Sequence, residues 1–210
     1  MNSSGSNKVK LTNSGGELDP AWSPDGTKIV YSATDFGSSV HRLVTINADG
    51  SSLTLLIDDG QDIRFSAWSP DGKKILFSTP RIGSNKYVLD ILTIANGQRV
   101  TVVEDQNSNV RPSWAVTGTI AYESVDSAGT SRIYTIAPDG TGRSLIPAPS
   151  AAGSPSWSPD GKRLAMYLSR PNQANRFLGV WFTNGPFTVY NNISGVNLDV
   201  TYIAWSPFLR

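Results

Sequence analysis

A six-residue motif repeats at a nearly constant interval along this chain. AWSPDG occupies residues 21–26 and occurs again, unchanged, at residues 67–72. Related motifs follow at three later places: SWAVTG at 113–118, SWSPDG at 156–161 and AWSP at 204–207. The tryptophans of successive motifs lie 46, 46, 43 and 48 residues apart. A period of this length is typical of repeat architectures in which each unit is one small supersecondary structure.

Each period carries the pattern of four short strands. The motif tryptophan ends the first strand, and an alternating segment such as Lys28–Ser32 follows the turn. The third strand, Leu43–Ile46 in the first period, ends at Asp49-Gly50, a dipeptide typical of hairpins, and Leu53–Ile57 forms the fourth. No segment has a helical pattern of useful length. We therefore predict an all-β fold, a β-propeller of four-stranded antiparallel blades.

The motif itself has a physical explanation. Ser-Pro-Asp-Gly fits a type I turn followed by a left-handed glycine, because proline presets the backbone at the first central position and glycine tolerates a positive φ. The large indole before each turn is expected to pack as a structural wedge between neighbouring blades. These five predicted wedges are Trp22, Trp68, Trp114, Trp157 and Trp205.

The repeats divide the chain into four complete blades and part of another. We expect residues 1–7 to be a flexible segment and residues 8–210 to form a single propeller domain, either complete or incomplete. The predicted blades span residues 17–57, 63–103, 109–146 and 152–190, and residues 8–12 and 198–207 match two strands of an incomplete fifth blade. Three explanations stay open: an excerpt of a longer propeller, a four-bladed ring with surplus strands, or a blade completed by another copy of the chain.

Composition excludes several classes of function. The 210 residues carry a formal net charge of +1, so the chain lacks the basic field that nucleic-acid binding requires. No apolar run approaches the length of about 20 residues that a membrane-spanning helix needs, and the first residues lack a secretory signal. We expect neither nucleic-acid binding nor membrane insertion. The absence of cysteine excludes disulfides and thiolate chemistry.

The residues offer little support for catalysis. His41 is the only histidine and is expected to be exposed and incidental, so no histidine cluster can bind a metal within one chain. There is no G-x-S-x-G motif for a nucleophilic serine. Aspartates such as Asp25 and Asp49 sit in tight turns, where their own backbone hydrogen bonding explains them better than calcium does. We predict no catalytic residues, no metal and no cofactor, and hence no enzymatic activity.

A binding site, if the fold has one, is expected at the mouth of the central channel. The residues just before each first-strand tryptophan vary between blades, and variation on a repeated scaffold is where specificity resides. The candidates are Asp19, Arg64, Arg111 and Tyr202, which offer both charges and an aromatic ring. This set suits a protein or peptide partner, although solvent exposure or a neutral ion pair explains it as well. Trp181 replaces a threonine of the other blades and is either a surface anchor or the filling of a packing gap.

The motif resembles a known repeat. Trp-Ser-Pro-Asp-Gly followed by a Lys-Ile-x-Tyr/Phe strand and an aspartate-glycine turn is similar to the WD40-like repeat of TolB-type β-propellers, over about residues 8–207. The third repeat departs from it, with Ala115–Gly118 in place of the usual turn. The resemblance implies a binding protein of the periplasm or the extracellular space. Similar blades also form the gating domain of prolyl-oligopeptidase-type serine peptidases.

Three functional hypotheses follow. The first is a non-enzymatic module that recognises a protein or peptide at the channel face. The second is a self-assembling protein whose incomplete blade is completed by other copies through open blade edges. The third is the accessory gating propeller of a hydrolase.

Overall fold

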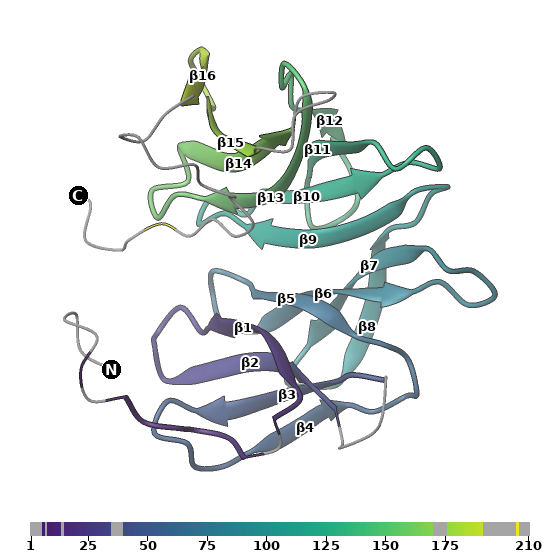
Figure 1. Ribbon diagram of the computed structural model, residues 1–210. Coiled ribbons are helices and arrows are strands. Elements are labelled where there is room, and N and C mark those ends of the chain that lie inside the picture. The colour runs from purple at the N-terminus through teal and green to yellow at the C-terminus, as the bar shows by residue number, and fades with distance from the viewer. Residues whose placement is uncertain are drawn as a thin grey trace.

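The chain folds into four small antiparallel sheets arranged around a common centre (Figure 1). The computed structural model describes residues 6, 8–13, 15–34, 40–169, 176–190 and 205. Every sheet has four strands, and within each sheet neighbouring strands are consecutive in sequence. The prediction of an all-β propeller with four complete blades is confirmed.

The first two blades occupy the lower half of Figure 1. The strands of blade one are β1 (Glu17–Trp22), β2 (Lys28–Ala33), β3 (Arg42–Asn47) and β4 (Thr54–Ile57). The strands of blade two are β5 (Arg64–Trp68), β6 (Lys74–Pro80), β7 (Tyr87–Thr93) and β8 (Gln98–Val103).

The other two blades occupy the upper half of the same view. The strands of blade three are β9 (Ser108–Trp114), β10 (Ile120–Val125), β11 (Ser131–Ile136) and β12 (Ser144–Leu145). The strands of blade four are β13 (Ala151–Trp157), β14 (Arg163–Ser169), β15 (Arg176–Phe182) and β16 (Phe187–Tyr190). The first strands β1, β5, β9 and β13 contact one another in series, so they form the inner wall of the arrangement.

The repeated turn has the conformation that its residues favour. Gly26 has a φ of 69° and donates its N–H to the Ser23 carbonyl at 2.9 Å. The Ser23 hydroxyl donates to Asp25 Oδ1 at 2.6 Å and accepts the N–H of Lys28 at 2.9 Å. The same bonds recur around Ser69 in blade two and Ser158 in blade four. Serine and aspartate therefore satisfy the polar groups of a turn that proline and glycine shape.

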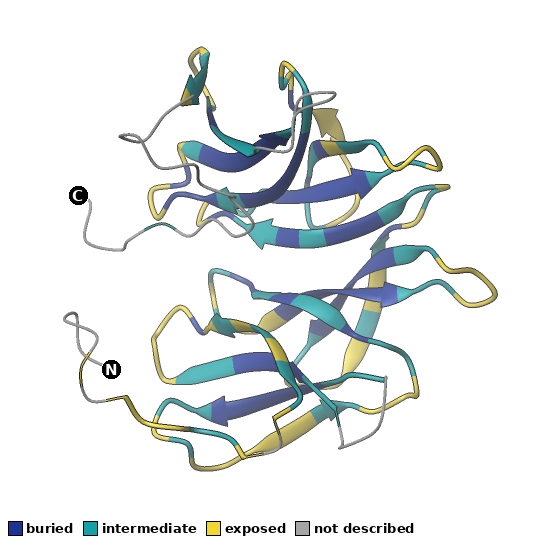
Figure 2. Ribbon diagram, in the orientation of Figure 1, coloured by how far each residue is buried: buried dark blue, intermediate teal, exposed yellow. Residues whose placement is uncertain are grey.

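The core lies between the blades, on the two faces of the middle strands (Figure 2). Successive residues of a strand point to opposite faces of the sheet. In β6, Ile75 therefore packs with Val30 of blade one, and the next residue, Leu76, packs with Ile120 of blade three. Glycine turns and outermost strands carry most of the exposed residues. Burial of both faces explains why the second strands read as nearly continuous apolar runs.

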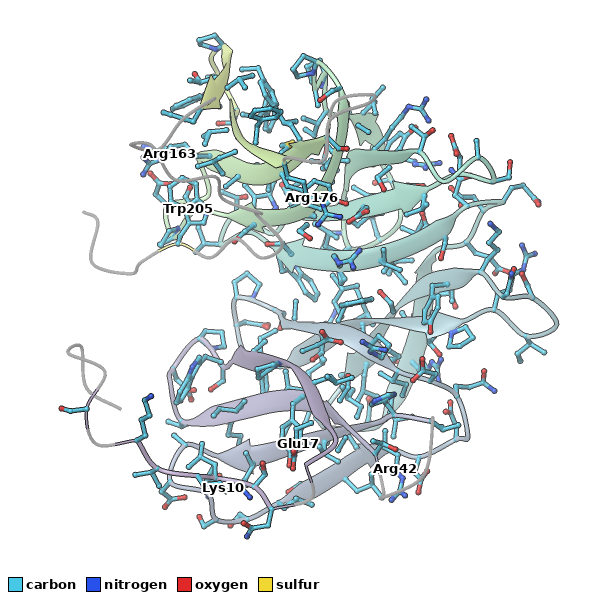
Figure 3. All side chains as sticks on the ribbon, viewed as in Figure 1. Lys10, Glu17, Arg42, Arg163, Arg176 and Trp205 are labelled. Carbon is cyan, nitrogen blue, oxygen red and sulfur yellow. The ribbon has the colours of Figure 1, made fainter. Side chains whose placement is uncertain are left out.

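Two of the blade tryptophans show how neighbouring blades are joined. The Trp68 indole N–H donates to the Ala21 carbonyl of blade one at 3.1 Å, and the Trp205 indole N–H donates to the Ser156 carbonyl of blade four at 2.8 Å. Ala21 and Ser156 each precede the tryptophan of their own blade, so the two contacts are equivalent. Arg163 stacks over the Trp205 ring at 5.0 Å (Figure 3). Trp205 thus has the place of a fifth first-strand tryptophan.

The other three predicted wedges differ from one another. Trp157 is buried beside blade three, whereas Trp114 is half-buried and donates its indole N–H to Gly118 of its own turn at 3.0 Å. Trp22 is 60% exposed and does not act as a wedge, because no described blade precedes blade one. An indole needs a neighbouring sheet to be buried, whatever its motif.

The terminal strands of the predicted fifth blade also differ from expectation. Residues 8–12 form no strand, since no described strand lies beside them to complete a hydrogen-bonded pair. Leu11 instead lies against Gly50, at the turn between β3 and β4. Residues 1–5 and 7 and, apart from Trp205, the predicted strand over 198–207 lie outside the described residues. The part of the chain that the structure describes contains no helix long and apolar enough to cross a membrane.

Candidate binding site at the channel mouth

Each inner strand contains one left-handed residue at the same position. Asp19, Phe65, Arg111 and Ser154 have φ values of 53°, 54°, 49° and 49°, and each lies three residues before its blade tryptophan. The pairing with the second strand shifts register at this point in all four blades. Each inner strand therefore bulges at the same level of the channel.

These bulges have a cost and a visible sequence signal. A positive φ is uncommon for non-glycine residues and is a genuine outlier for bulky ones such as Phe65 and Arg111. A strained residue costs on the order of 1–3 kcal/mol and persists only where its surroundings hold it, which is a common property of ligand-binding sites. Proline follows the left-handed residue at Pro20, Pro112 and Pro155. Because proline cannot donate to a sheet, prolines inside a strand are a signal for a bulge.

The four bulges meet around one small cavity, which we call the channel mouth. Asp19, Phe65, Arg111 and Ser154, together with the residue that follows each, line a volume of about 220 Å³. Ligand pockets for small molecules typically measure about 300–1,000 Å³. The channel mouth is therefore sized for one side chain or a chain end rather than for a large cofactor.

Asp19 and Arg64 form the first ion pair at the channel mouth. Arg64 Nε donates to Asp19 Oδ2 at 3.1 Å, and the backbone N–H of Phe65 donates to the same oxygen at 3.2 Å. The Asp19 side chain is 9% exposed and that of Arg64 is 26% exposed. A carboxylate of blade one thus holds the left-handed residue of blade two and is itself largely covered.

Arg111 and Glu123 form the second ion pair. Arg111 Nη1 donates to Glu123 Oε2 at 3.2 Å. The Arg111 guanidinium also lies over the Phe65 ring, 4.8 Å from its centroid, and the Arg64 guanidinium lies 5.2 Å from the same ring. Phe65 is therefore stacked against two cations, which restricts the orientation of both guanidinium groups.

Glu123 is the buried centre that supports this side of the channel mouth. Besides Arg111, it accepts hydrogen bonds from the Ser154 N–H at 3.0 Å, the Tyr167 hydroxyl at 3.1 Å and the Ser131 hydroxyl at 2.7 Å. A Cβ atom at Gly153 would lie 2.5 Å from Glu123 Oε2, so only glycine leaves room there. Burial, together with the charge and hydrogen bond of Glu123, raises the pKa of Tyr167, so its hydroxyl stays a donor.

The structure brings together three of the four site residues predicted from the sequence. Asp19 pairs with Arg64, and Arg111 lies on the same Phe65 ring. Tyr202 lies outside the described residues. Sequence reasoning missed Glu123 as the anchor of Arg111, although a carboxylate directly after the apolar residues Ile120–Tyr122 is the signal that could have found it.

His41 has a different environment from the one expected. It is not exposed: its side chain is 12% accessible, and its Nδ1 lies 2.5 Å from Asp62 Oδ1. The Tyr87 hydroxyl donates to Asp62 Oδ2 at 2.7 Å. Burial and this hydrogen bond raise the pKa of Tyr87 to about 12. The three side chains link blade one to blade two, and none of them lines the channel mouth.

Two other features fit packing roles. Trp181 is half-buried against the core of blade four and meets Trp157 edge-on, with 6.3 Å between ring centroids. It therefore fills a packing gap rather than standing out as a surface anchor. Within the described ranges no group of three or more histidine, cysteine, aspartate or glutamate residues is placed to hold a metal ion. The turn aspartates accept bonds from neighbouring hydroxyl and N–H groups, as Asp25 does from Ser23 and Thr27.

A larger groove lies on the outer side of blade two. It has a volume of about 770 Å³ and includes Arg81, Glu104, Asp59, Asp90 and Arg99 among its lining residues. Its charges pair internally: Arg81 binds Glu104, and Arg99 binds both Asp59 and Asp90. Because these charged groups are already paired with one another, they are less available to bind a ligand than the size of the groove suggests.

Comparisons with known proteins bear on the fold. The structure is similar to TolB from Acinetobacter baumannii, with a TM-score of 0.69 and 20% identity over 82% of this chain and 43% of that one. It is also similar to a putative TolB from Agrobacterium tumefaciens, with a TM-score of 0.70 and 16% identity over 81% of this chain and 63% of that one. A puromycin-hydrolyzing peptidase from Mycobacterium tuberculosis gives a TM-score of 0.68 and 11% identity, over 85% of this chain and 29% of the peptidase.

These similarities identify the fold as a TolB-type β-propeller. The chain spans less than two thirds of the length of each of these three structures. No family model matches the sequence, and no curated protein matches it.

Proposed function

We propose that this chain is a non-enzymatic β-propeller module that binds a segment of a protein or peptide at the channel mouth. The observation that carries the proposal is the convergence of four left-handed, non-glycine residues, one from each blade, around a single small cavity. Strained backbone residues of this kind cluster at ligand-binding sites, and here they converge on one cavity.

The chemistry of the channel mouth supports a peptide segment over a cofactor. The Phe65 ring, the Arg111 guanidinium and the Asp19 carboxylate line a volume that fits one side chain, and the paired groups Arg64 and Glu123 support them. Aromatic rings and arginines are the residues that dominate protein recognition sites. The likeness to TolB structures supports a protein-binding role.

The test is a selection from a displayed library of random 12-residue peptides on the immobilised protein. We expect enriched peptides to bind the wild type and to lose at least about tenfold in affinity on the double variant Asp19→Ala/Arg111→Ala. The matched control is Arg81→Ala/Glu104→Ala, which removes an ion pair from the outer groove of blade two. Peptides that bind the channel variant as well as the wild type, or a selection that enriches none, would remove the channel mouth as the binding site.

A second candidate function, self-assembly, rests on a different observation. Trp22 is 60% exposed and Leu18 is 38% exposed on β1, whereas the equivalent Trp68 is buried against the preceding blade. We propose as this alternative that the inner strand of a second copy covers Trp22 in the way that blade one covers Trp68. Light scattering tests it: a dimer or larger ring that Trp22→Glu dissociates supports assembly, and a monomer at high concentration rejects it.

A third candidate, an accessory propeller of a hydrolase, rests on the likeness to the peptidase from Mycobacterium tuberculosis. In that case a catalytic domain belongs to the same native protein. Reading the native coding sequence beyond this chain distinguishes it from the first two candidates.

A further inference from the structure

In both ion pairs of the channel mouth, the carboxylate is more deeply buried in the protein than the guanidinium. Arg111 has a side chain that is 36% exposed, and its partner Glu123 is 2% exposed. Arg64 is 26% exposed, and its partner Asp19 is 9% exposed. In the second pair, Arg111 lines the channel mouth and Glu123 does not, so an incoming group meets the guanidinium there rather than the carboxylate; in the first pair, Asp19 is the lining residue. The formal charges of the four side chains cancel.

Arg111 retains hydrogen-bond donors that nothing described occupies. Its Nη1 donates to Glu123, and no other hydrogen bond or ion pair of its guanidinium is found within the described part of the chain. A guanidinium carries five N–H donors in a planar fork that matches a carboxylate. Arg111 lines the channel mouth, so these remaining N–H donors are placed to meet a ligand there.

The orientation of this fork is set from two sides. Glu123 accepts from one nitrogen of Arg111, and the Phe65 ring lies under the guanidinium plane at 4.8 Å. The left-handed backbone conformation of Arg111 also fixes the direction in which its side chain leaves the strand. A donor group held in place before a ligand arrives loses little conformational entropy on binding, which favours affinity.

Asp19 does not cancel this preference for an anion. Its Oδ2 accepts both Arg64 Nε, at 3.1 Å, and the Phe65 N–H, at 3.2 Å. Asp19 lines the channel mouth, but its charge is already paired with Arg64. Glu123 is paired in the same way by Arg111 and by the Ser154 N–H.

We propose that the channel mouth recognises a carboxylate of the bound segment, and that Arg111 is the residue that binds it across the Phe65 ring. This inference rests on the proposed function and specifies its ligand chemistry. The carboxylate is either an acidic side chain or the free C-terminus of a chain. Both present the same two oxygens to the guanidinium fork.

The experiment uses small matched probes and a readout at the residue itself. The probes are N-acetylglutamate amide, which carries a side-chain carboxylate; N-acetylglycylglycine, which carries a terminal carboxylate; and N-acetylglutamine amide, which carries neither. Each is titrated into nitrogen-15-labelled protein, and the side-chain Nε–H signal of Arg111 and the amide signals of Phe65 and Ser154 are followed by NMR. We expect saturable shifts with a carboxylate probe and at least about tenfold weaker binding of the glutamine probe.

Variants make the result specific. Arg111→Lys keeps a cation beside Glu123 but loses the planar fork, so we expect carboxylate binding to weaken about tenfold while the fold is retained. Arg132→Lys is the matched control, because Arg132 is half exposed in a surface pair with Asp126. The affinity of the carboxylate probes should also fall as salt is added, since Arg111 is partly exposed to solvent.

The possible outcomes separate the two levels of the proposal. Stronger binding of one carboxylate probe supports the inference and identifies side chain or terminus as the source. Equal binding of the glutamine and glutamate probes at these signals overturns the carboxylate inference and leaves the channel mouth as a binding site. Shifts that Arg111→Lys leaves unchanged overturn the role of Arg111. If no probe moves these signals, the inference fails, and the channel mouth fails as a site if the selected peptides also leave them unmoved.

Discussion

Glu123 Oε2 accepts the backbone N–H of Ser154 at 3.0 Å, so a carboxylate of blade three holds the left-handed residue of blade four. Asp19 does the same for Phe65 between blades one and two. These two contacts join adjacent blades at the level of the channel mouth. The site and the contact between blades therefore share the same side chains.

Removing the Glu123 carboxylate should destabilise the protein strongly. Glu123→Ala leaves the Ser154 N–H and the Arg111 guanidinium without their acceptor, and we expect a loss of about 2–4 kcal/mol in the free energy of unfolding. The matched control Glu104→Ala removes a surface partner of Arg81 and should cost at most about 1 kcal/mol. Urea unfolding followed by tryptophan fluorescence measures both. Equal losses for the two variants would contradict the role assigned to Glu123.

The blade tryptophans should differ in their contribution to stability. Trp68 is buried and bonded to blade one, so Trp68→Ala should cost about 3–5 kcal/mol. Trp22 is 60% exposed, and Trp22→Ala in the monomer should change stability by about 0.5 kcal/mol or less. The measurement is the urea midpoint of each variant at low protein concentration. A loss for Trp22→Ala as large as that for Trp68→Ala would show that a neighbouring blade covers this residue in solution.

The repeated turns should make the fold sensitive to acid. Hydrogen bonds from serine hydroxyls and backbone N–H groups lower the pKa values of Asp25, Asp71 and Asp160 below 3.8. A lowered folded-state pKa means that the stabilisation is present above the unfolded value of 3.8 and is lost as the pH falls through the folded value. The triple variant Asp25→Asn/Asp71→Asn/Asp160→Asn should therefore lose less stability than the wild type between about pH 5 and pH 2.

Carbon-13 NMR titration of the carboxyl groups checks the cause of this acid sensitivity. Ser23→Ala removes the largest contribution to the Asp25 shift and should move the pKa of Asp25 back toward 3.8. Asp160, in another blade, serves as the internal control and should titrate unchanged in this variant. An Asp25 that titrates as in the wild type would rule out the serine hydroxyl as the cause.

The buried tyrosines should make the fold sensitive to alkali. Burial raises the pKa of Tyr122 to about 12, and burial with a hydrogen bond to Asp62 raises the pKa of Tyr87 to about 12. In the unfolded chain both ionise near 10.0, so their stabilisation is complete below that pH and is lost as the pH rises toward 12. Tyr87→Phe/Tyr122→Phe should flatten the fall in stability between pH 10 and pH 12, as measured by urea unfolding. A fall as steep as in the wild type would show that other groups cause it.

Local chemistry explains which parts of the fold could be predicted. Pro24, Asp25 and Gly26 specify a turn through their own backbone preferences, and the glycine has the left-handed φ of 69° that the motif favours. The short run of β-branched and aromatic residues within Lys28–Ser32 likewise predicts a strand without knowledge of its neighbours. Because the motif recurs with a nearly constant period, the blade and its repetition follow from the sequence.

The candidate site was only partly predictable, because some of its contacts join residues that are far apart in the sequence. The positions of Asp19 and Arg111 could be found because they vary on a repeated scaffold, and Pro20 and Pro112 signal an interruption of the strand. Glu123 could not be paired with Ser154 from sequence, because that contact depends on how β10 and β13 of neighbouring blades approach each other. Its contact with Arg111 depends on the shifted register between β9 and β10. The same limit applies to His41, whose partner Asp62 comes from the connection to the next blade.

The sequence by itself thus determined the strands, the turns and the number of complete blades, since these depend on residues close together in the chain. Only the tertiary structure decided that Trp68 is buried while Trp22 is exposed, and that Arg111 faces the channel mouth with its carboxylate partner behind it. Identical motifs have different environments because burial and charge pairing depend on the neighbouring blade, and a blade at the end of a row lacks the neighbour that an inner blade has.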